Sequence, residues 1–122
     1  MSTADGAFDT DESCLFCKIV AGDIPADLVH TGERVVAFRD IAPKAPLHVL
    51  VVPRDHKPNA AATAAADPAL IGELVSVADA IATGEGQPAY NLLFNTGEAA
   101  GQTVFHTHLH VLAGGKLTEL PV

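Results

Sequence analysis

The sequence predicts an α+β fold in which a five-stranded, mostly antiparallel sheet carries one main helix and a short N-terminal helix. Two observations predict this fold. Several segments rich in β-branched and aromatic residues are joined mostly by short links, which favours antiparallel pairing of neighbouring strands. One longer segment, Asp67 to Thr83, instead places its apolar residues at helical spacing.

Capping signals and periodicity predict the helices. Cys14 to Gly22 is expected to form a short helix that ends at its glycine. Asn59 to Ala66 is rich in alanine. Asp67 is expected to cap the main helix, with Pro68 in its first turn, and Gly84 is expected to end it. One face of this helix should pack on the sheet as core, through Leu70, Ile71, Leu74, Val75, Ala78 and Ile81.

Five short segments are expected to be strands because they are apolar and β-branched. They are Leu28 to His30, Arg34 to Arg39, His48 to Pro53, Tyr90 to Asn95 and Val104 to Ala113. Loop signals separate several of them. These loops are a turn at Thr31 to Glu33, a segment with two prolines at Ile41 to Pro46 and a glycine-containing loop at Thr96 to Gly101.

The length of 122 residues predicts one domain, which we place at residues 13–122. Residues 1–12 are acidic and polar and are expected to be a disordered tail. This start has no basic or apolar stretch, so no signal peptide is expected, and no run approaches the length of a membrane span. The protein is therefore expected in the cytoplasm, with its two cysteines reduced.

Charge excludes one class of partner. The net charge is −8, with seven Lys and Arg residues against fifteen Asp and Glu residues. Nucleic-acid backbones are bound by basic surfaces, so no nucleic-acid partner is expected. A single nucleotide is not excluded, because backbone amides and histidines can hold its phosphate.

The most informative residues are three histidines at two-residue spacing: His106, His108 and His110. In an extended strand, alternate side chains point to the same face, so the three imidazoles are expected to share one face. Imidazole is suited to proton exchange, to attack on phosphorus and to metal binding near neutral pH. The sequence therefore predicts a functional site on this strand.

Three interpretations of the histidine row were weighed. The rings could be half-buried polar groups, three ligands of a catalytic zinc ion, or a nucleophile with orienting neighbours. The preceding loop contains Gly97, Gly101, Gln102 and Thr103. Glycines let backbone N–H groups approach an anion, and the two polar residues add donors, so this loop favours a phosphate over a metal.

The stretch from Gly101 to Leu112 closely resembles the signature of the histidine-triad (HIT) superfamily, His-x-His-x-His followed by apolar residues. The resemblance runs from about Ser13 to Gly115 and is greatest in the Hint branch, the nucleoside phosphoramidate hydrolases. Further blocks carry it at Cys14 to Ala26, Phe38 to Ile41, Pro46 to Pro53 and Asn95 to Gly97.

The resemblance implies an enzyme without a catalytic metal. His108 would attack the α-phosphorus of a nucleotide and form a covalent nucleotidyl-imidazole that water then hydrolyses. His110 would bind the phosphoryl oxygens and assist proton transfer. Thr103 and Gln102 would donate hydrogen bonds there, with Thr103 near the leaving group, and His48 would support the triad.

The resemblance also implies a purine nucleotide as substrate. Asp40 would accept hydrogen bonds from the ribose hydroxyls, with a turn or cap aspartate before Ile41 as the less favoured alternative on composition alone. An apolar cleft would surround the base, and a loop would surround the phosphate. The implied cleft residues are Phe16, Ile19, Phe38 and Ile41, and the implied phosphate-side residues are Asn95, Gly101, Gln102, Thr103, Val104, His108 and His110.

Cys14 and Cys17 form a Cys-x-x-Cys pair that is compatible with a redox pair, half of a zinc site or coincidence. A closed structural zinc site needs four ligands, which His56 and His106 could complete. Bacterial relatives with this opening resemble that arrangement. We therefore expect a structural zinc ion, with a reduced, metal-free pair as the alternative.

Other functions stay open from the sequence. They are a dinucleoside polyphosphate hydrolase of the Fhit-like type, a zinc hydrolase and a non-enzymatic nucleotide-binding protein. The resemblance implies a homodimer, with contacts through Asp67 to Thr83 and Tyr90 to Asn95. The C-terminal residues Leu120 to Val122 are expected to shape the leaving-group side.

Overall fold

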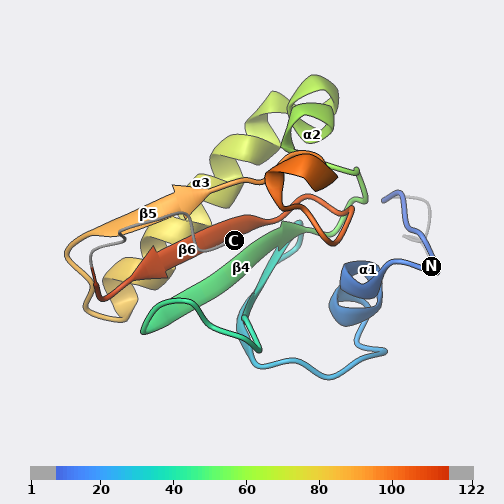
Figure 1. The fold of residues 1–122 in the computed structure, drawn as a ribbon. Helices are drawn as coiled ribbons and strands as arrows, with labels where there is room; N and C mark the ends of the chain where they lie inside the picture. The colour runs from blue at the N-terminus through green and yellow to red at the C-terminus, as the bar shows by residue number, and fades with distance from the viewer. Residues whose placement is uncertain (1–7, 116–122) are drawn as a thin grey trace.

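A five-stranded sheet forms the centre of the protein in the computed structural model, which describes residues 8–115. The strand order is β2-β3-β4-β6-β5, and all four neighbouring pairs are antiparallel (Figure 1). The α+β class and the sheet are thus as the sequence predicts. The strands are β2 (Leu28–Thr31), β3 (Val35–Arg39), β4 (Leu47–Pro53), β5 (Tyr90–Leu93) and β6 (Leu109–Ala113). The helices are α1 (Leu15–Val20), α2 (Ala60–Ala66), α3 (Pro68–Gly84) and the short 3₁₀ helix η1 (Glu98–Ala100).

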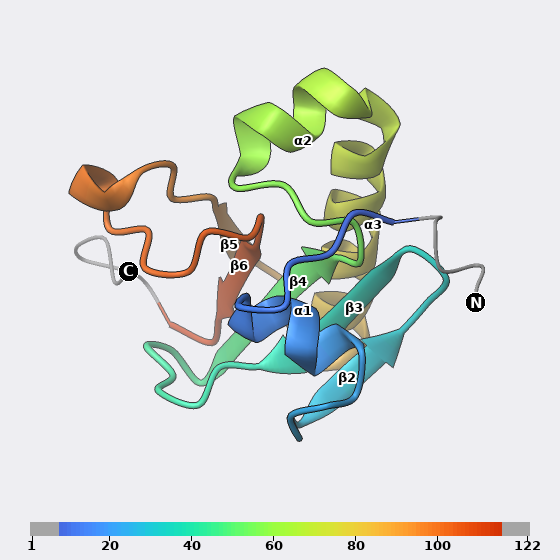
Figure 2. The same ribbon diagram turned by 90° about the vertical axis from the view of Figure 1, so that its right-hand side faces the viewer.

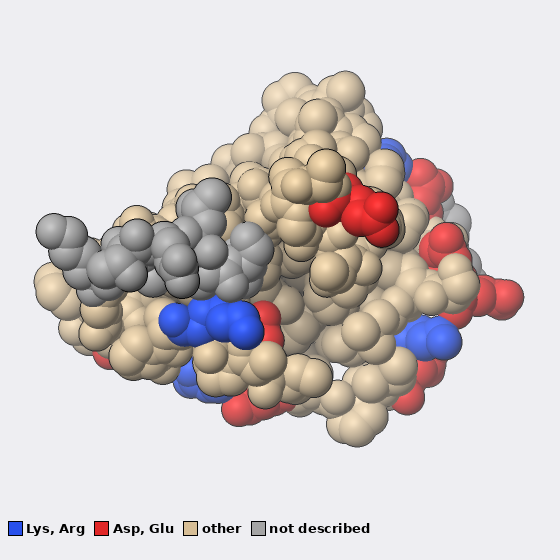
Figure 3. Space-filling view, in the orientation of Figure 1, with Lys and Arg blue, Asp and Glu red and all other residues tan. Residues whose placement is uncertain are grey.

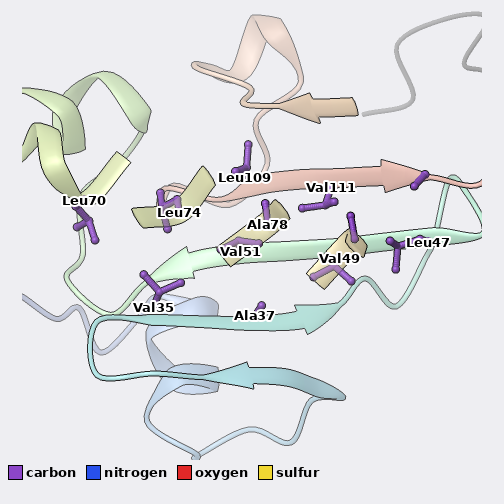
Figure 4. Close-up of a cluster of buried hydrophobic side chains, with 12 residues drawn as sticks. Val35, Ala37, Leu47, Val49, Val51, Leu70, Leu74, Ala78, Leu109 and Val111 are labelled. Atoms are coloured by element: carbon purple, nitrogen blue, oxygen red, sulfur yellow. The ribbon is translucent and has the colours of Figure 1, made fainter. Parts of the chain in front are cut away.

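The two faces of the sheet have different roles, because side chains alternate along each strand. Helix α3 covers one face, and its Leu74 packs there with Val49, Val51 and Leu109 in the α3-side core (Figure 4). Helix α1 lies on the opposite face (Figure 2). There the α1-side cluster consists of Cys14, Phe16, Cys17, Val36, Phe38, Leu50 and Val52.

The buried face of the main helix, α3, consists of slightly different residues from those predicted. The buried residues follow an i, i+4 pattern, whereas Val75 is 39% exposed and does not belong to the core. Ala82, which the prediction omitted, is fully buried. The buried residues of α3 are Leu70, Leu74, Ala78 and Ala82, with Ile71 and Ile81 partly buried against them.

Helix α2 was not predicted as a separate helix. Asn59 caps it, because the side-chain oxygen of Asn59 accepts a hydrogen bond from Ala62 N at 2.9 Å. Asp67 lies between α2 and α3 and is the N-cap residue of α3, as predicted, but its side chain makes no capping hydrogen bond. Its carboxylate instead pairs with the guanidinium of Arg34 at 2.7 Å.

The histidine strand is shorter than predicted. Strand β6 begins at Leu109, and the preceding residues 104–108 form a bend and an irregular segment. The backbone N–H of Thr107 donates to Lys57 O at 2.9 Å, so at this point the chain bonds to the segment after β4 rather than to a strand. Strand β5 similarly ends at Leu93, because Asn95 Nδ2 bonds to Ala100 O at 2.8 Å within the following turn.

Part of the predicted N-terminal tail is held against the domain. Asp9 O accepts the backbone N–H of His56 at 2.8 Å, and its carboxylate accepts from Lys57 Nζ at 2.6 Å. Residues 1–7 and the predicted leaving-group residues Leu120 to Val122 lie outside the described residues. None of the helices within residues 8–115 is both long and apolar enough to cross a membrane.

Candidate functional site

The three histidines lie on the α1 side of the sheet although only His110 belongs to β6. The ring of Phe16 in α1 lies 6.1 Å from the ring of His106 and 5.0 Å from that of His108, between centroids. Thr107 points the other way, and its hydroxyl is 2.7 Å from that of Thr63 in α2. The predicted alternation therefore holds, even where the chain has left the sheet.

A backbone carbonyl fixes the hydrogen position on His108. The Nδ1 atom of His108 lies 2.7 Å from His106 O, and a carbonyl oxygen can only accept, so Nδ1 carries the hydrogen. In the neutral ring this leaves a lone pair on Nε2. Burial lowers the pKa of His108, which keeps the ring neutral near pH 7. His108 therefore presents an uncharged ring with an oriented lone pair, which is chemically able to act as a nucleophile.

His48, on β4, joins His110 to the loop before that strand. His48 Nε2 lies 3.0 Å from His110 Nδ1 and 3.5 Å from Asp40 Oδ2. Its other nitrogen, Nδ1, accepts the backbone N–H of Lys44 at 3.0 Å. Burial, with the neighbouring His108 and His48, lowers the pKa of His110 to about 4. The triad is thus extended by a fourth, buried imidazole.

A second group of side chains meets around His106. Cys14 is the N-cap residue of α1, Cys17 lies in its first turn, and His56 comes from the segment after β4. Cys14 Sγ is 3.4 Å and Cys17 Sγ 3.5 Å from His106 Nδ1, and His56 Nδ1 lies 3.0 Å from the same atom. A tetrahedral zinc ion with bonds of about 2.0 Å to nitrogen and about 2.3 Å to sulfur separates its ligand atoms by roughly 3.3–3.8 Å. The two sulfur–nitrogen distances lie in this range, and the 3.0 Å distance between the two nitrogen atoms is slightly shorter, so the four side chains could hold a zinc ion after a small adjustment.

Asp40 makes the turn interaction that the sequence left open, and its carboxylate also faces His48. Its Oδ1 accepts the backbone N–H of Ala42 at 2.8 Å, which is the turn interaction. Its Oδ2 lies 3.5 Å from His48 Nε2. The side chain keeps 20% of its surface exposed, so its carboxylate remains reachable by a ligand.

The predicted base-binding residues differ in exposure. Phe16 and Phe38 are buried and pack edge to face with centroids 5.4 Å apart, whereas Ile41 is fully exposed and Ile19 is half-buried. Leu15, which the sequence pattern did not single out, is 45% exposed on α1. Leu15 lines a hollow of about 410 Å³ that includes Cys14, His56, Thr103, Val104 and Phe105.

The glycine loop before the triad is held closed by Gln102. Both amide hydrogens of Gln102 are donated within the protein, to Pro58 O at 2.6 Å and Val104 O at 3.0 Å. Its Oε1 accepts from Gly97 N at 2.9 Å. A contact from this amide to a phosphate would therefore require breaking one of these bonds. Gly101 adopts a φ of +95°, which favours glycine at this position.

Some hydrogen-bond partners that the sequence could not reveal are backbone atoms. Two of them, Lys44 N and Pro53 O, orient the rings of His48 and His106. Charged side chains are sparse on the face drawn in Figure 3, where most of the surface is uncharged. Recognition of an anion there would rely on hydrogen bonds more than on a basic patch.

Comparisons with known proteins place the chain in a family. The sequence model of the HIT domain family matches residues 21–117. The purine nucleoside phosphoramidase of Escherichia coli is 39% identical over 108 residues, which cover 87% of this chain and 91% of that protein. An uncharacterized HIT-like protein of Synechococcus elongatus is 43% identical over 111 residues, covering 90% and 97%. A solved HIT family hydrolase from Clostridium thermocellum superposes with a TM-score of 0.86 at 36% identity, covering 93% of this chain and all of that one.

The depressed pKa of His110 predicts how acid affects stability. Its folded value of about 4 lies below the ordinary value of 6.5, so the unfolded chain binds the proton more readily. The stabilisation is complete above pH 6.5 and is lost as the pH falls toward 4. We expect His110→Asn to reduce the slope of unfolding free energy against pH in this range, by up to about 1.4 kcal/mol per pH unit.

Denaturant unfolding of both proteins between pH 7.5 and pH 4 measures this slope. Titrating groups common to the two proteins largely cancel in the difference. Identical slopes for the wild type and His110→Asn would contradict the expected role of this buried ring.

Proposed function

We propose, from the premise that this chain belongs to the HIT domain family, that it cleaves nucleoside 5′-phosphoramidates or related nucleoside monophosphate conjugates. The reaction would pass through a covalent nucleotidyl-histidine at His108. The single observation that supports this most directly is the 2.7 Å bond from His108 Nδ1 to His106 O, which leaves the lone pair on Nε2. Neutral imidazole is a competent nucleophile toward phosphorus.

The reaction proceeds in two balanced steps. In the first, His108 Nε2 forms a bond to the α-phosphorus, and the bond from phosphorus to the leaving nitrogen breaks. The electron pair stays with the leaving amine, which takes a proton from water, while the neutral His110 donates a hydrogen bond to a phosphoryl oxygen. In the second, water attacks phosphorus and gives one proton back to the solvent, which replaces the proton taken in the first step. The bond to Nε2 breaks, and the lone pair returns to His108 as nucleoside monophosphate leaves.

The remaining residues position the substrate. The hydroxyl of Thr103 is exposed beside the triad segment and is suited to donate to a phosphoryl oxygen. Asp40 has a carboxylate oxygen suited to accept from the ribose hydroxyls. The exposed Ile41 and half-buried Ile19, above buried Phe16 and Phe38, offer apolar surface to a purine. Asn95, Gly101, Gln102 and Val104 would shape the phosphate side of this site.

Replacement of the nucleophile tests the proposal. We expect His108→Asn to lower turnover of an adenosine phosphoramidate by at least about 10⁴-fold, because no covalent intermediate can form. Binding of adenosine monophosphate should persist. Mass spectrometry after mixing wild-type protein with this substrate and quenching in base should find an adenylylated peptide that contains His108.

His30→Asn is the matched control, because His30 lies on β2, a strand at the edge of the sheet. Turnover that survives His108→Asn would overturn the proposed nucleophile. A preference for a diadenosine polyphosphate over the phosphoramidate would instead support the Fhit-like alternative. Binding of adenosine monophosphate by wild-type protein, with no turnover of either substrate, would indicate a non-enzymatic binding protein.

We also propose that the cysteine–histidine cluster binds a structural zinc ion. Burial raises the pKa of the Cys17 thiol to about 11, and a bound cation would offset that cost by stabilising the thiolate. Zinc there would tie α1 to the segments that carry His56 and His106. The two cysteines are free of a disulfide, as this site requires, and a reducing compartment such as the cytoplasm would maintain them so.

Removal of one ligand tests the zinc site. We expect about one tightly bound zinc ion per chain, and at least tenfold weaker binding with a lower melting temperature in Cys17→Ser. Ser13→Ala is the control beside the cluster. Zinc content by elemental analysis and melting by circular dichroism provide the measurements, and unchanged zinc affinity in Cys17→Ser would contradict the proposed ligand set.

A homodimer is proposed through α3 and β5. Strand β5 forms one edge of the sheet among the described residues, so its outer backbone groups are available for contacts. Val75 lies on α3 outside the α3-side core and is 39% exposed. Together these features provide a surface of the kind that twofold partners share.

Sedimentation equilibrium tests the dimer. We expect twice the mass of one chain at micromolar concentration. Val75→Glu should shift the equilibrium toward monomer, because it places a charge in an apolar contact. Thr31→Glu on the opposite edge strand should not shift it. A monomeric wild type would contradict the proposal.

A further inference from the structure

Two clusters of side chains among the described residues could hold a metal ion, and their backbone surroundings differ. One consists of Cys14, Cys17, His56 and His106, and the other of Asp40, His48 and His110. In each, the potential ligand atoms lie within 4.8 Å of one another. Residue type alone therefore does not separate a metal site from a metal-free one.

In the first cluster the backbone prepares a ligand. His106 Nε2 lies 2.8 Å from Pro53 O, and the carbonyl can only accept, so Nε2 carries the hydrogen. The lone pair then lies on Nδ1, the atom that faces Cys14 and Cys17. A histidine that binds a metal through one nitrogen and donates from the other is the arrangement that metal sites favour.

In the second cluster the backbone does the opposite. His48 Nδ1 accepts the N–H of Lys44 at 3.0 Å, so the hydrogen of the neutral ring must lie on Nε2. A metal ion at Nε2 would force that hydrogen onto Nδ1, where it would face the N–H of Lys44. Two donors would then oppose each other in a buried site, which costs free energy.

The loop that supplies this N–H is anchored at its start. Asp40 N donates to His48 O at 3.0 Å, and Ala42 N donates to Asp40 Oδ1 at 2.8 Å. Pro43 and Pro46 flank Lys44 and restrict the backbone further. Relieving the opposing donors would require this restricted loop to move away from His48.

The fixed hydrogen on His48 determines the hydrogen on His110 as well. With a hydrogen on His48 Nε2, the 3.0 Å contact to His110 Nδ1 is a hydrogen bond that His110 accepts. The hydrogen of neutral His110 then lies on its Nε2. We infer that the backbone N–H of Lys44, acting through His48, holds His110 as an Nε2–H donor and closes the Asp40–His48–His110 cluster to transition-metal ions.

His48 is thus a positioning residue. Its assistance to catalysis rests on the proposed function, in which the Nε2–H of His110 donates to the phosphoryl group. The ring assignments and the exclusion of metal do not rest on that function. Burial also lowers the pKa of His48, which agrees with a neutral ring whose Nδ1 accepts a hydrogen bond.

Nitrogen-15 NMR of the histidine rings tests the inference on the full, zinc-loaded chain without any substrate. Long-range proton–nitrogen correlations distinguish a protonated from an unprotonated ring nitrogen. We expect hydrogen on Nε2 of His48 and His110 but on Nδ1 of His108. Hydrogen on Nδ1 of His48, or of His110, would overturn the inference whether or not the protein hydrolyses phosphoramidates.

A matched pair of variants tests metal exclusion. Lys44→Pro removes the backbone N–H, whereas Lys44→Ala removes the side chain and keeps the N–H. Zinc titration followed by elemental analysis should find one tight site in the wild type and in Lys44→Ala. In Lys44→Pro we expect a second site that binds at least tenfold more tightly than any second site in the wild type, and that His48→Asn abolishes.

If circular dichroism shows that Lys44→Pro does not fold, zinc titration of the wild type and of His48→Asn tests the exclusion of metal. A second tight zinc site in the wild type that His48→Asn removes would overturn the inference. Equal second-site affinity in folded Lys44→Pro and Lys44→Ala would also overturn it.

Discussion

His106 is the residue that connects the cysteine–histidine cluster to His108. Its Nε2 bonds to Pro53 O at the end of β4, its Nδ1 faces two sulfur atoms and His56, and its carbonyl oxygen accepts from His108. The side chain of His106 thus belongs to the cluster, and its backbone orients the ring of His108. A displacement of His106 would change the orientation of the His108 ring, because a single hydrogen bond joins the two residues.

Alternation of side chains along β6 and the segment before it puts core residues on one face of the sheet and histidines on the other. Leu109 and Val111 point into the α3-side core, while His108 and His110 point toward α1. Pairing of Leu50 with His110 across β4 and β6 brings His48 two positions along on the same face. Such diagonal neighbours lie within reach of long side chains, and the two rings have centroids 5.2 Å apart. The register of one strand pair therefore places the fourth imidazole.

Much of this architecture is predictable from local pattern. The strand segments, the single-face arrangement of His106, His108 and His110, and the helix over 67–83 follow from alternation and periodicity. The start of β6 does not, because Thr107 bonds to Lys57, fifty residues earlier in the chain. Helix α2 could not be predicted either, because its alanine-rich sequence has no large apolar residues at helical spacing to mark a buried face.

The hydrogen positions on the rings could not be predicted from residue types. Each depends on a backbone atom that tertiary folding brings to the ring, such as Pro53 O for His106. The sequence also assigned Gln102 to the phosphate, whereas its amide bonds to backbone atoms of its own loop and of Pro58. A polar residue before a motif does not reveal whether its hydrogen bonds serve a ligand or the chain.

Asp9 connects a segment that precedes α1 to one of the four residues of the cysteine–histidine cluster. Its carbonyl oxygen accepts the backbone N–H of His56, and its carboxylate accepts from Lys57 Nζ. Deleting the segment that contains Asp9 would therefore free the backbone of His56. A truncation upstream of α1 would change the surroundings of the cluster without removing any of its four side chains.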